Sequence, residues 1–190
     1  MTVLVPWGLW VNRDSGWLTH ARQVISPNQD ERPPGMVPEW LVVHGISLPP
    51  GEYGGPWIDA LFTNCLDPTA HPYFHEIHCL RVSAHVFIAR DGSLTQYVPF
   101  HRRAWHAGRS NLNGRTQCND FTIGIELEGT DVAPYEEIQY QTLASLISAL
   151  IVAYPTLSKE QIVGHSDIAP GRKTDPGPAF NWERLKSLLV

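Results

Sequence analysis

The sequence lacks several features that would place it in a specialised class of protein. It has only three cysteines in 190 residues, Cys65, Cys79 and Cys118, an odd number without the spacing of a disulfide framework or a cysteine-rich metal site. No apolar run approaches the ~20 residues that a membrane-spanning helix needs. We therefore expect free, buried thiols in a reducing compartment and no contact with a membrane.

Basic charge is also scarce. The chain has 14 Lys and Arg against 19 Asp and Glu, which gives a net charge of −5. Proteins that bind nucleic acid present a concentrated basic face, whereas Arg102, Arg103, Arg109 and Arg115 are separated by other residue types. This composition excludes DNA or RNA as the main partner, although one small anionic ligand would suit these arginines.

The first residues do not form an export signal. Residues 1–11 are apolar, but they have no basic start, Pro6 and Gly8 interrupt them, and no small-residue cleavage site follows. We therefore expect a cytoplasmic protein. With no repeat or linker in the chain, residues 1–190 are predicted to form one domain, with residues 1–38 as a largely irregular arm that packs on it and includes one short strand.

The rest of the chain alternates between strand and helix patterns. Strands are predicted at 40–44, 86–89, 94–98, 122–127 and 161–165, and helices at 57–62, 72–80, 135–152 and 182–189. Asp91-Gly92 between two of the strands is a strong hairpin signal. The expected fold is therefore α/β, with a central mixed sheet flanked by helices.

Nine histidines raise the question of a metal site. The segment from His71 to His78 does not have the helical zinc motif, because His75 and His78 are three residues apart and not four, and Pro72 confines His71 to the start of the helix. We interpret this segment as a polar helix face.

His44 and His165 are better candidates. Each ends an apolar strand beside a glycine, where a side chain can leave the core and face a cleft. Asp175 precedes a proline, which favours extended backbone, so Lys173 and Asp175 project to the same side. Two imidazoles and one carboxylate leave a position open for water, as in catalytic zinc sites. The alternative is two buried histidines bonded to backbone, with Asp175 capping a turn.

A general base would have to come from another carboxylate. In the segment 122–128, Ile123, Ile125 and Leu127 alternate with Glu126 and Glu128, which places both acids on one strand face. The alternative is an acidic strand face exposed to solvent, and the alternation alone does not separate Glu126 from Glu128. Gly124 leaves room for a ligand beside Glu126, which favours Glu126 as the base.

Long motifs in these regions resemble the AmpD-type 1,6-anhydro-N-acetylmuramoyl-L-alanine amidases. The similarity runs from about residue 40 to the C-terminus and includes seven segments in order. They are Val42-Val43-His44, Ser47-Leu48-Pro49-Pro50-Gly51, Gly54-Gly55-Pro56-Trp57-Ile58-Asp59, Arg81-Val82-Ser83-Ala84-His85, Arg103-Ala104-Trp105-His106-Ala107-Gly108, Ile123-Gly124-Ile125-Glu126-Leu127-Glu128-Gly129, and Gly164 through Gly177 with His165, Lys173 and Asp175.

The resemblance implies the fold shared by phage lysozyme-type amidases and peptidoglycan recognition proteins. It implies one zinc ion per chain, with ligands His44, His165 and Asp175. It also implies Glu126 as the general base, Lys173 as the group that stabilises the transition state, and Trp105 and Arg81 as contacts for the substrate. Gly45 departs from the family pattern, which has Asn there, so one contact to the substrate is expected to be missing.

The function implied is zinc-dependent hydrolysis of the amide between (1,6-anhydro-)N-acetylmuramic acid and L-alanine in muropeptides, for peptidoglycan recycling, by a monomeric enzyme. A cysteine nucleophile is a poor competitor, because no cysteine has a convincing histidine partner. Two alternatives remain: a lytic amidase that acts on intact wall, and a recognition module without catalysis. The first would be expected to carry an export signal or wall-binding repeats, and the second to lack the metal ligands and the base.

Overall fold

The computed structural model describes residues 8–189 of the 190-residue chain. Its strands are β1 Val11–Asn12, β2 Trp17–Leu18, β3 Arg22–Gln23, β4 Gln29–Asp30, β5 Trp40–Ile46, β6 Val86–Ile88, β7 Leu94–Gln96, β8 Arg103–Ala104, β9 Asn111–Leu112, β10 Arg115–Thr116, β11 Thr122–Glu128 and β12 Ile162–Gly164. Its helices are α1 Trp57–Phe62, α2 Pro72–Ile77, α3 Glu137–Ala153, α4 His165–Ile168 and α5 Trp182–Leu188, with a 3₁₀ turn, η1, at Cys118–Asp120.

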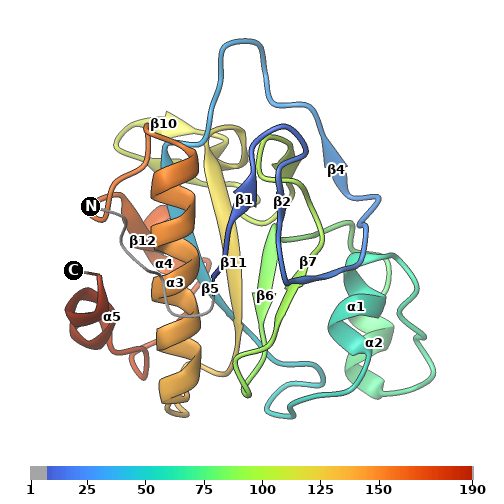
Figure 1. Ribbon diagram of the computed structural model, residues 1–190. Coiled ribbons are helices and arrows are strands. Elements are labelled where there is room, and N and C mark those ends of the chain that lie inside the picture. The colour runs from blue at the N-terminus through green and yellow to red at the C-terminus, as the bar shows by residue number, and fades with distance from the viewer. Residues whose placement is uncertain (1–7, 190) are drawn as a thin grey trace.

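A six-stranded mixed sheet forms the centre, in the order β12-β5-β11-β6-β7-β3. The pairs β12/β5, β5/β11, β11/β6 and β3/β7 are parallel, and only the β6/β7 hairpin is antiparallel. In Figure 1 the long helix α3 crosses one face of the sheet with α5 beside it, while α1 and α2 lie at the far end near β7. The predicted α/β architecture is confirmed.

The two central strands separate a core face from a polar face. Alternate residues of β5 and β11, including Val43, Ile123 and Ile125, are fully buried against α3 residues such as Leu143 and Leu146. The residues between them, which include His44 and Glu126, project to the opposite face because side chains alternate along a strand. Packing of α3 therefore determines which side of the sheet carries the polar residues.

Several element boundaries differ from the sequence-based expectation by a few residues, including those of β5, β12 and α2. β5 continues through Gly45 to Ile46, because β11 pairs with it over its whole length. The strand expected to end at His165 ends at Gly164, and His165 begins the short helix α4. α2 begins at Pro72 as expected but ends at Ile77, where the Arg81 guanidinium donates to the carbonyls of the next three residues.

The cysteines match one expectation and contradict another. All three are free, as predicted. Only Cys118 is buried, however, and Cys65 and Cys79 are exposed, because they lie in the turns that follow α1 and α2 and not in the core. Among the described residues, no helix is long and apolar enough to cross a membrane.

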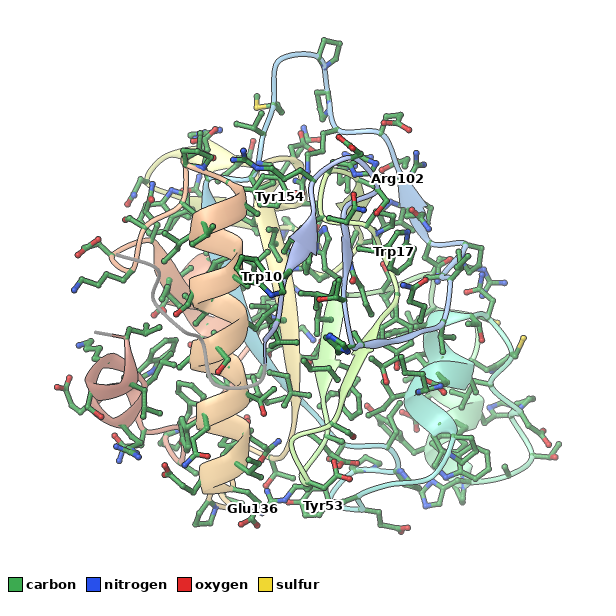
Figure 2. The ribbon with its side chains drawn as sticks, viewed as in Figure 1. Trp10, Trp17, Tyr53, Arg102, Glu136 and Tyr154 are labelled. Carbon is green, nitrogen blue, oxygen red and sulfur yellow. The ribbon has the colours of Figure 1, made fainter. Side chains whose placement is uncertain are left out.

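The N-terminal arm, residues 8–38, contains four two-residue strands where one was expected. β1 and β2 pair with each other, β3 extends the central sheet beside β7, and β4 pairs with β8. Figure 2 shows the arm tryptophans Trp10 and Trp17 on the same side of the molecule. These pairings make the arm part of the domain surface and not a detached tail.

Arg32 anchors the arm. Its buried guanidinium donates to the carbonyls of Asn119, Asp120, Phe100 and Thr122 at 2.9–3.2 Å. Burial lowers its pKa to about 10, so the side chain keeps its positive charge at neutral pH. Arg32 thus provides donors for carbonyls of η1, β11 and Phe100, and its bonds to Phe100 and Thr122 are buried.

Replacing Arg32 by Met should destabilise the fold strongly, because several buried carbonyls lose their donor at once. We expect the free energy of unfolding to fall by about 3–5 kcal/mol, measured as a shift of the urea midpoint at pH 7. Arg13→Met is the matched control: Arg13 is exposed and its Nε donates to one carbonyl, that of Ala153. Its loss should stay under about 1 kcal/mol, and equal losses would contradict the anchoring role of Arg32.

Candidate metal and catalytic site

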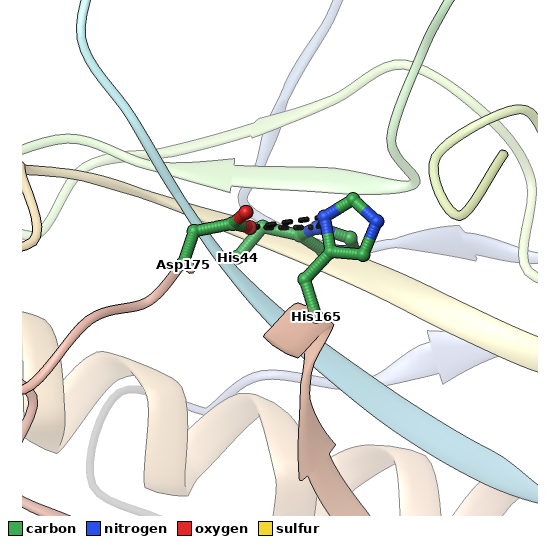
Figure 3. Close-up of side chains that lie close together, drawn as sticks. All are labelled: His44, His165 and Asp175. Atoms are coloured by element: carbon green, nitrogen blue, oxygen red, sulfur yellow. Dashed lines mark hydrogen bonds and ion pairs between the residues drawn. The ribbon is translucent and has the colours of Figure 1, made fainter. Parts of the chain in front are cut away.

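Three side chains from separate parts of the chain meet on the polar face of the sheet. His44 comes from β5, His165 is the first residue of α4, and Asp175 lies in the loop before α5 (Figure 3). The two Nδ1 atoms are 2.9 Å apart, and Asp175 Oδ2 lies 3.2 Å from Nδ1 of His44 and 3.1 Å from Nδ1 of His165. Histidine, cysteine, aspartate and glutamate are the side chains considered as metal ligands. Among the residues described, only these three form a cluster of such side chains that could hold a metal ion.

His44 adds no positive charge to this site, and Asp175 adds a negative one. Burial lowers the pKa of His44 to about 4, although Asp175 acts in the opposite direction, so its ring is neutral at pH 7. Burial of Asp175 opposes its ionisation, but the adjacent side chains of His165 and His44 hold its pKa far below the usual value. A carboxylate and two histidine rings thus converge on one point.

The contact of Nε2, the nitrogen of His165 that does not face Asp175, shows which ring nitrogen carries the proton. Nε2 lies 3.3 Å from the carbonyl oxygen of Ala107, which can only accept. In the neutral ring the proton is therefore on Nε2, and Nδ1 presents a lone pair to Asp175. At most one proton, on Nδ1 of His44, can then lie among the three converging atoms, and this is the arrangement of a cation site.

Glu126 lies directly beside His44, since the two residues are register partners in the parallel pair β5/β11. Its Oε2 is buried and has no hydrogen-bond partner among the described residues. Burial, together with the nearby Asp175 carboxylate, raises the pKa of Glu126 well above its usual value, while Lys173 acts in the opposite direction. An unpaired, buried carboxyl group next to a candidate metal site is a strong candidate for proton transfer.

Glu128 shares the strand face but has different partners. Its two carboxylate oxygens accept from the backbone N–H groups of Gly54 and Arg90, and the side chain is buried. Arg90 in turn packs over the Tyr53 ring and pairs with Glu136, and Figure 2 places both of those residues at the same end of the molecule. Glu128 therefore holds two loops, and the strand face is not solvated.

A cleft of about 530 Å³ opens beside these groups. His165, Asp175, Glu126 and the exposed Lys173 contribute to its polar end. The rest of the lining includes the apolar side chains of Leu48, Leu61, Phe62, Tyr73, Ile77, Leu80, Val82 and Trp105, together with the polar residues Ser47, Ser83, His106, Thr130 and Asp131. A polar, charged end and a stretch of apolar side chains suit a ligand that has both a reacting amide and a larger non-reacting body.

Trp105 is held firmly in this wall. Its indole N–H donates to Asp30 at 3.2 Å, and Asp30 also accepts two 2.6 Å bonds from the Arg103 guanidinium. The pairing of β4 with β8 places these residues together. Through Asp30, the N-terminal arm therefore supports one wall of the cleft.

Arg81 takes a different position from Trp105. It is exposed, and its guanidinium lies 3.2–3.5 Å from the carbonyls of His78, Cys79 and Leu80. Its neighbours Leu80 and Val82 line the cleft, but Arg81 is not among the lining residues. A substrate contact by Arg81 would require its side chain to leave these carbonyls.

The space beside Gly124 is filled, so the expectation that a ligand approaches there was wrong. A side chain on Gly124 would begin 2.3 Å from the ring of His106, which occupies that space. Sequence reasoning missed His106, because a single histidine within an apolar segment is usually a core residue. Its ring lies 2.9 Å from Nε2 of His44.

The position of Tyr135 explains why residue 45 is a glycine. A Cβ atom there would lie 2.3 Å from the hydroxyl of Tyr135. That hydroxyl donates at 3.0 Å to the carbonyl of Pro176, the residue after Asp175. A glycine at this position leaves space for the tyrosine, which supports the loop that carries the candidate carboxylate ligand.

Comparisons with known proteins agree with this geometry. The family model described as N-acetylmuramoyl-L-alanine amidase matches residues 34–178. The 1,6-anhydro-N-acetylmuramyl-L-alanine amidase AmpD of Salmonella typhimurium strain SL1344 is 61% identical over 177 residues, which are 93% of this chain and 94% of that protein.

Solved structures show the same relationship. The crystal structure of a selenomethionine AmpD derivative superposes with a TM-score of 0.91 at 60% identity and covers 93% of this chain and 98% of that one. The Escherichia coli amidase AmiD, in complex with the substrate anhydro-N-acetylmuramic acid-L-Ala-D-gamma-Glu-L-Lys, has a TM-score of 0.59 at 27% identity, covering 96% of this chain and 66% of that one. On the family match, the identity and the shared fold, the chain belongs to the N-acetylmuramoyl-L-alanine amidase family.

Proposed function

We propose that this enzyme binds one zinc ion through His44, His165 and Asp175 and hydrolyses the amide between N-acetylmuramic acid and L-alanine in soluble 1,6-anhydromuropeptides. The single observation that carries the proposal is the convergence of three ligand atoms within 3.2 Å of one another, beside the unpaired carboxyl of Glu126. The proposed site needs no residue from a second copy of the chain, and we propose that the enzyme is a monomer.

The spacing of the three atoms fits zinc. Ligands at zinc distances of about 2.0–2.1 Å lie about 3.3 Å apart in a tetrahedron, close to the 2.9–3.2 Å found between these atoms. Two nitrogens and one oxygen are also the donor set of many hydrolytic zinc enzymes, with a fourth position left for water. When bound, zinc would supply a Lewis acid that acidifies water and polarises the scissile carbonyl.

Glu126 is proposed as the general base. Its raised pKa makes the ionised carboxylate a better proton acceptor than a surface glutamate, and its acid form can then protonate the departing alanine amine. Lys173 provides the positive charge at the same end of the cleft, where it would stabilise the negative charge that develops on the carbonyl oxygen. No covalent intermediate with the protein is required.

The cleft walls suggest how the substrate is held. The fixed indole of Trp105 offers a flat apolar surface to a sugar ring. Arg81 is proposed to pair with a carboxylate of the peptide or sugar after it leaves the carbonyls it now caps. The names of the relatives support this substrate class, since AmpD is named for 1,6-anhydro-N-acetylmuramyl-L-alanine and AmiD was solved with an anhydromuramyl peptide.

We further propose that the enzyme works in the cytoplasm during peptidoglycan recycling. The substrate class in the names of its relatives supports this proposal, because anhydromuropeptides are soluble fragments of wall turnover and not intact wall. The three free cysteines, two of them exposed, also suit a reducing compartment.

Metal content tests the ligand set. Alanine at His44, His165 or Asp175 should abolish zinc retention after desalting, because two remaining ligands cannot form the tetrahedral site. Elemental analysis should find about one zinc per chain in the parent protein. His75→Ala, an exposed histidine on α2, is the control and should keep its zinc. Full occupancy in all three ligand variants would reject the assignment.

Two glutamate variants on the same strand test the base. Glu126→Gln should keep zinc and fold but lower kcat by about 10²–10⁴-fold. Glu128→Gln is the matched control, because it replaces a carboxylate that accepts only from backbone N–H groups. It should lose stability and retain more turnover than Glu126→Gln. If Glu128→Gln were the less active variant at equal zinc content, the base would have been assigned to the wrong carboxylate.

Product analysis tests the substrate. Purified anhydromuropeptide should yield free peptide and anhydro-N-acetylmuramic acid, with or without its glucosamine, whereas intact sacculi should yield little of either. Mass spectrometry of both digests gives the relative rates. Faster release from sacculi would favour a lytic role over recycling and would leave the metal assignment intact.

A further inference from the structure

Two consecutive residues contact the Nε2 atoms of both candidate metal histidines, the ring nitrogens that point away from the metal site. Nδ1 of His106 lies 2.9 Å from Nε2 of His44, and the carbonyl oxygen of Ala107 lies 3.3 Å from Nε2 of His165. We propose that the His106–Ala107 pair, with Thr122 behind it, is a positioning element that fixes the tautomer of both rings and turns their lone pairs toward the metal. This inference rests on the proposed metal site.

The proton positions follow from a chain of hydrogen bonds that begins at a carbonyl. The hydroxyl of Thr122 lies 2.7 Å from the carbonyl oxygen of Cys118, which can only accept, so the single hydroxyl proton is used there. The oxygen of Thr122 must therefore accept at its other contact, the Nε2 atom of His106 at 3.1 Å. The proton of His106 is thus on Nε2.

The same reasoning continues into the metal site. With its proton on Nε2, neutral His106 presents a lone pair from Nδ1, and the facing Nε2 of His44 must donate to it. Neutral His44 then has no proton on Nδ1. Both histidines consequently direct a lone pair at the carboxylate of Asp175, and three acceptors meet with no proton between them. A cation bound between them would satisfy all three.

The fold holds this positioning element rigidly. The side-chain oxygen of Asn119 accepts from the backbone N–H groups of both His106 and Ala107, at 3.1 and 2.8 Å. The ring of His106 is buried and meets the ring of His44 edge-on, with centroids 5.0 Å apart and an interplanar angle of 86°. Gly124 provides the necessary space, since any side chain there would collide with the ring.

The expected size of the effect comes from metal sites in general. Removing a partner that orients a metal-binding histidine typically weakens metal affinity by about 10–100-fold. Nδ1 of His106 faces Nε2 of His44, and among the described residues the ligand atoms that converge belong to His44, His165 and Asp175 and not to His106. A positioning role therefore predicts weaker zinc binding and an altered tautomer, without loss of a ligand.

Zinc affinity is measured by competition with a chelator of known affinity. His106→Leu removes the acceptor and should weaken zinc binding by about 10–100-fold. His106→Asn keeps an acceptor, because its Oδ1 is as far from the backbone as Nδ1 of histidine, and should restore most of the affinity. Thr122→Val keeps the shape but frees the tautomer of His106, and should weaken binding less than His106→Leu.

The matched control is Thr142→Val. Thr142 is also buried, and its hydroxyl also donates to a carbonyl, that of Gly92, but it lies on α3, which covers the opposite face of the sheet. This variant should bind zinc as the parent does.

A second measurement is ¹⁵N NMR of the zinc-free protein. It should find His44 protonated on Nε2 in the parent and as a mixture of tautomers in Thr122→Val.

The outcomes separate this inference from the proposed function. If the parent binds zinc tightly and His106→Leu binds it equally well, or if His44 carries its proton on Nδ1, the positioning role is wrong and the metal site stands. If the parent binds no zinc, the metal assignment itself fails. Should His106→Leu not fold, the Thr122→Val comparison and the NMR measurement still decide the question.

Discussion

The in-register parallel pairing of β5 with β11 is the constraint on which the site depends. It places His44 beside Glu126 and, on the other face, Val43 beside Ile125. A shift of either strand by one residue would turn its polar side chain, His44 or Glu126, into the core beneath α3 and its aliphatic side chains into the cleft. Apolar packing against α3 therefore also maintains the distance between the candidate metal ligand and the candidate base.

Burial then determines the protonation of the polar groups at this site. The sheet and the loops around it bury His44, His106 and the Oε2 atom of Glu126, so these groups are determined mainly by their neighbours. Two carboxyl groups illustrate this: burial raises the pKa of Glu126, which has no hydrogen-bond partner, whereas at Asp175 the adjacent histidines outweigh burial and lower the pKa. The same cleft thus contains a ligand carboxylate and a carboxyl group suited to exchanging protons.

The sequence alone predicted much of this arrangement. Alternation along 122–128 and the apolar run at 40–44 were sufficient to place strands and core, because burial on one face leaves a period of two. The candidate ligands His44, His165 and Asp175 were found from local signals, namely strand ends and a following proline. The family resemblance added the roles of Glu126 as general base and Lys173 as the group that stabilises the transition state.

What the sequence did not predict depends on contacts between distant segments. Glu128 could not be separated from Glu126, since its partners are the backbone N–H groups of Gly54 and Arg90. His106 was missed because its role depends on Thr122 and His44, which only the folded sheet brings to it. Gly124 was interpreted as room for a ligand, whereas that room belongs to the His106 ring.

The contact between Gly45 and Tyr135 has a consequence for substitution. Any side chain at position 45 would occupy the place of the Tyr135 hydroxyl, and that hydroxyl supports the loop of Asp175. A larger residue at position 45 therefore requires the ring of Tyr135 to move. The two positions are coupled: the effect of a substitution at position 45 depends on the residue at position 135, which is far away in the chain.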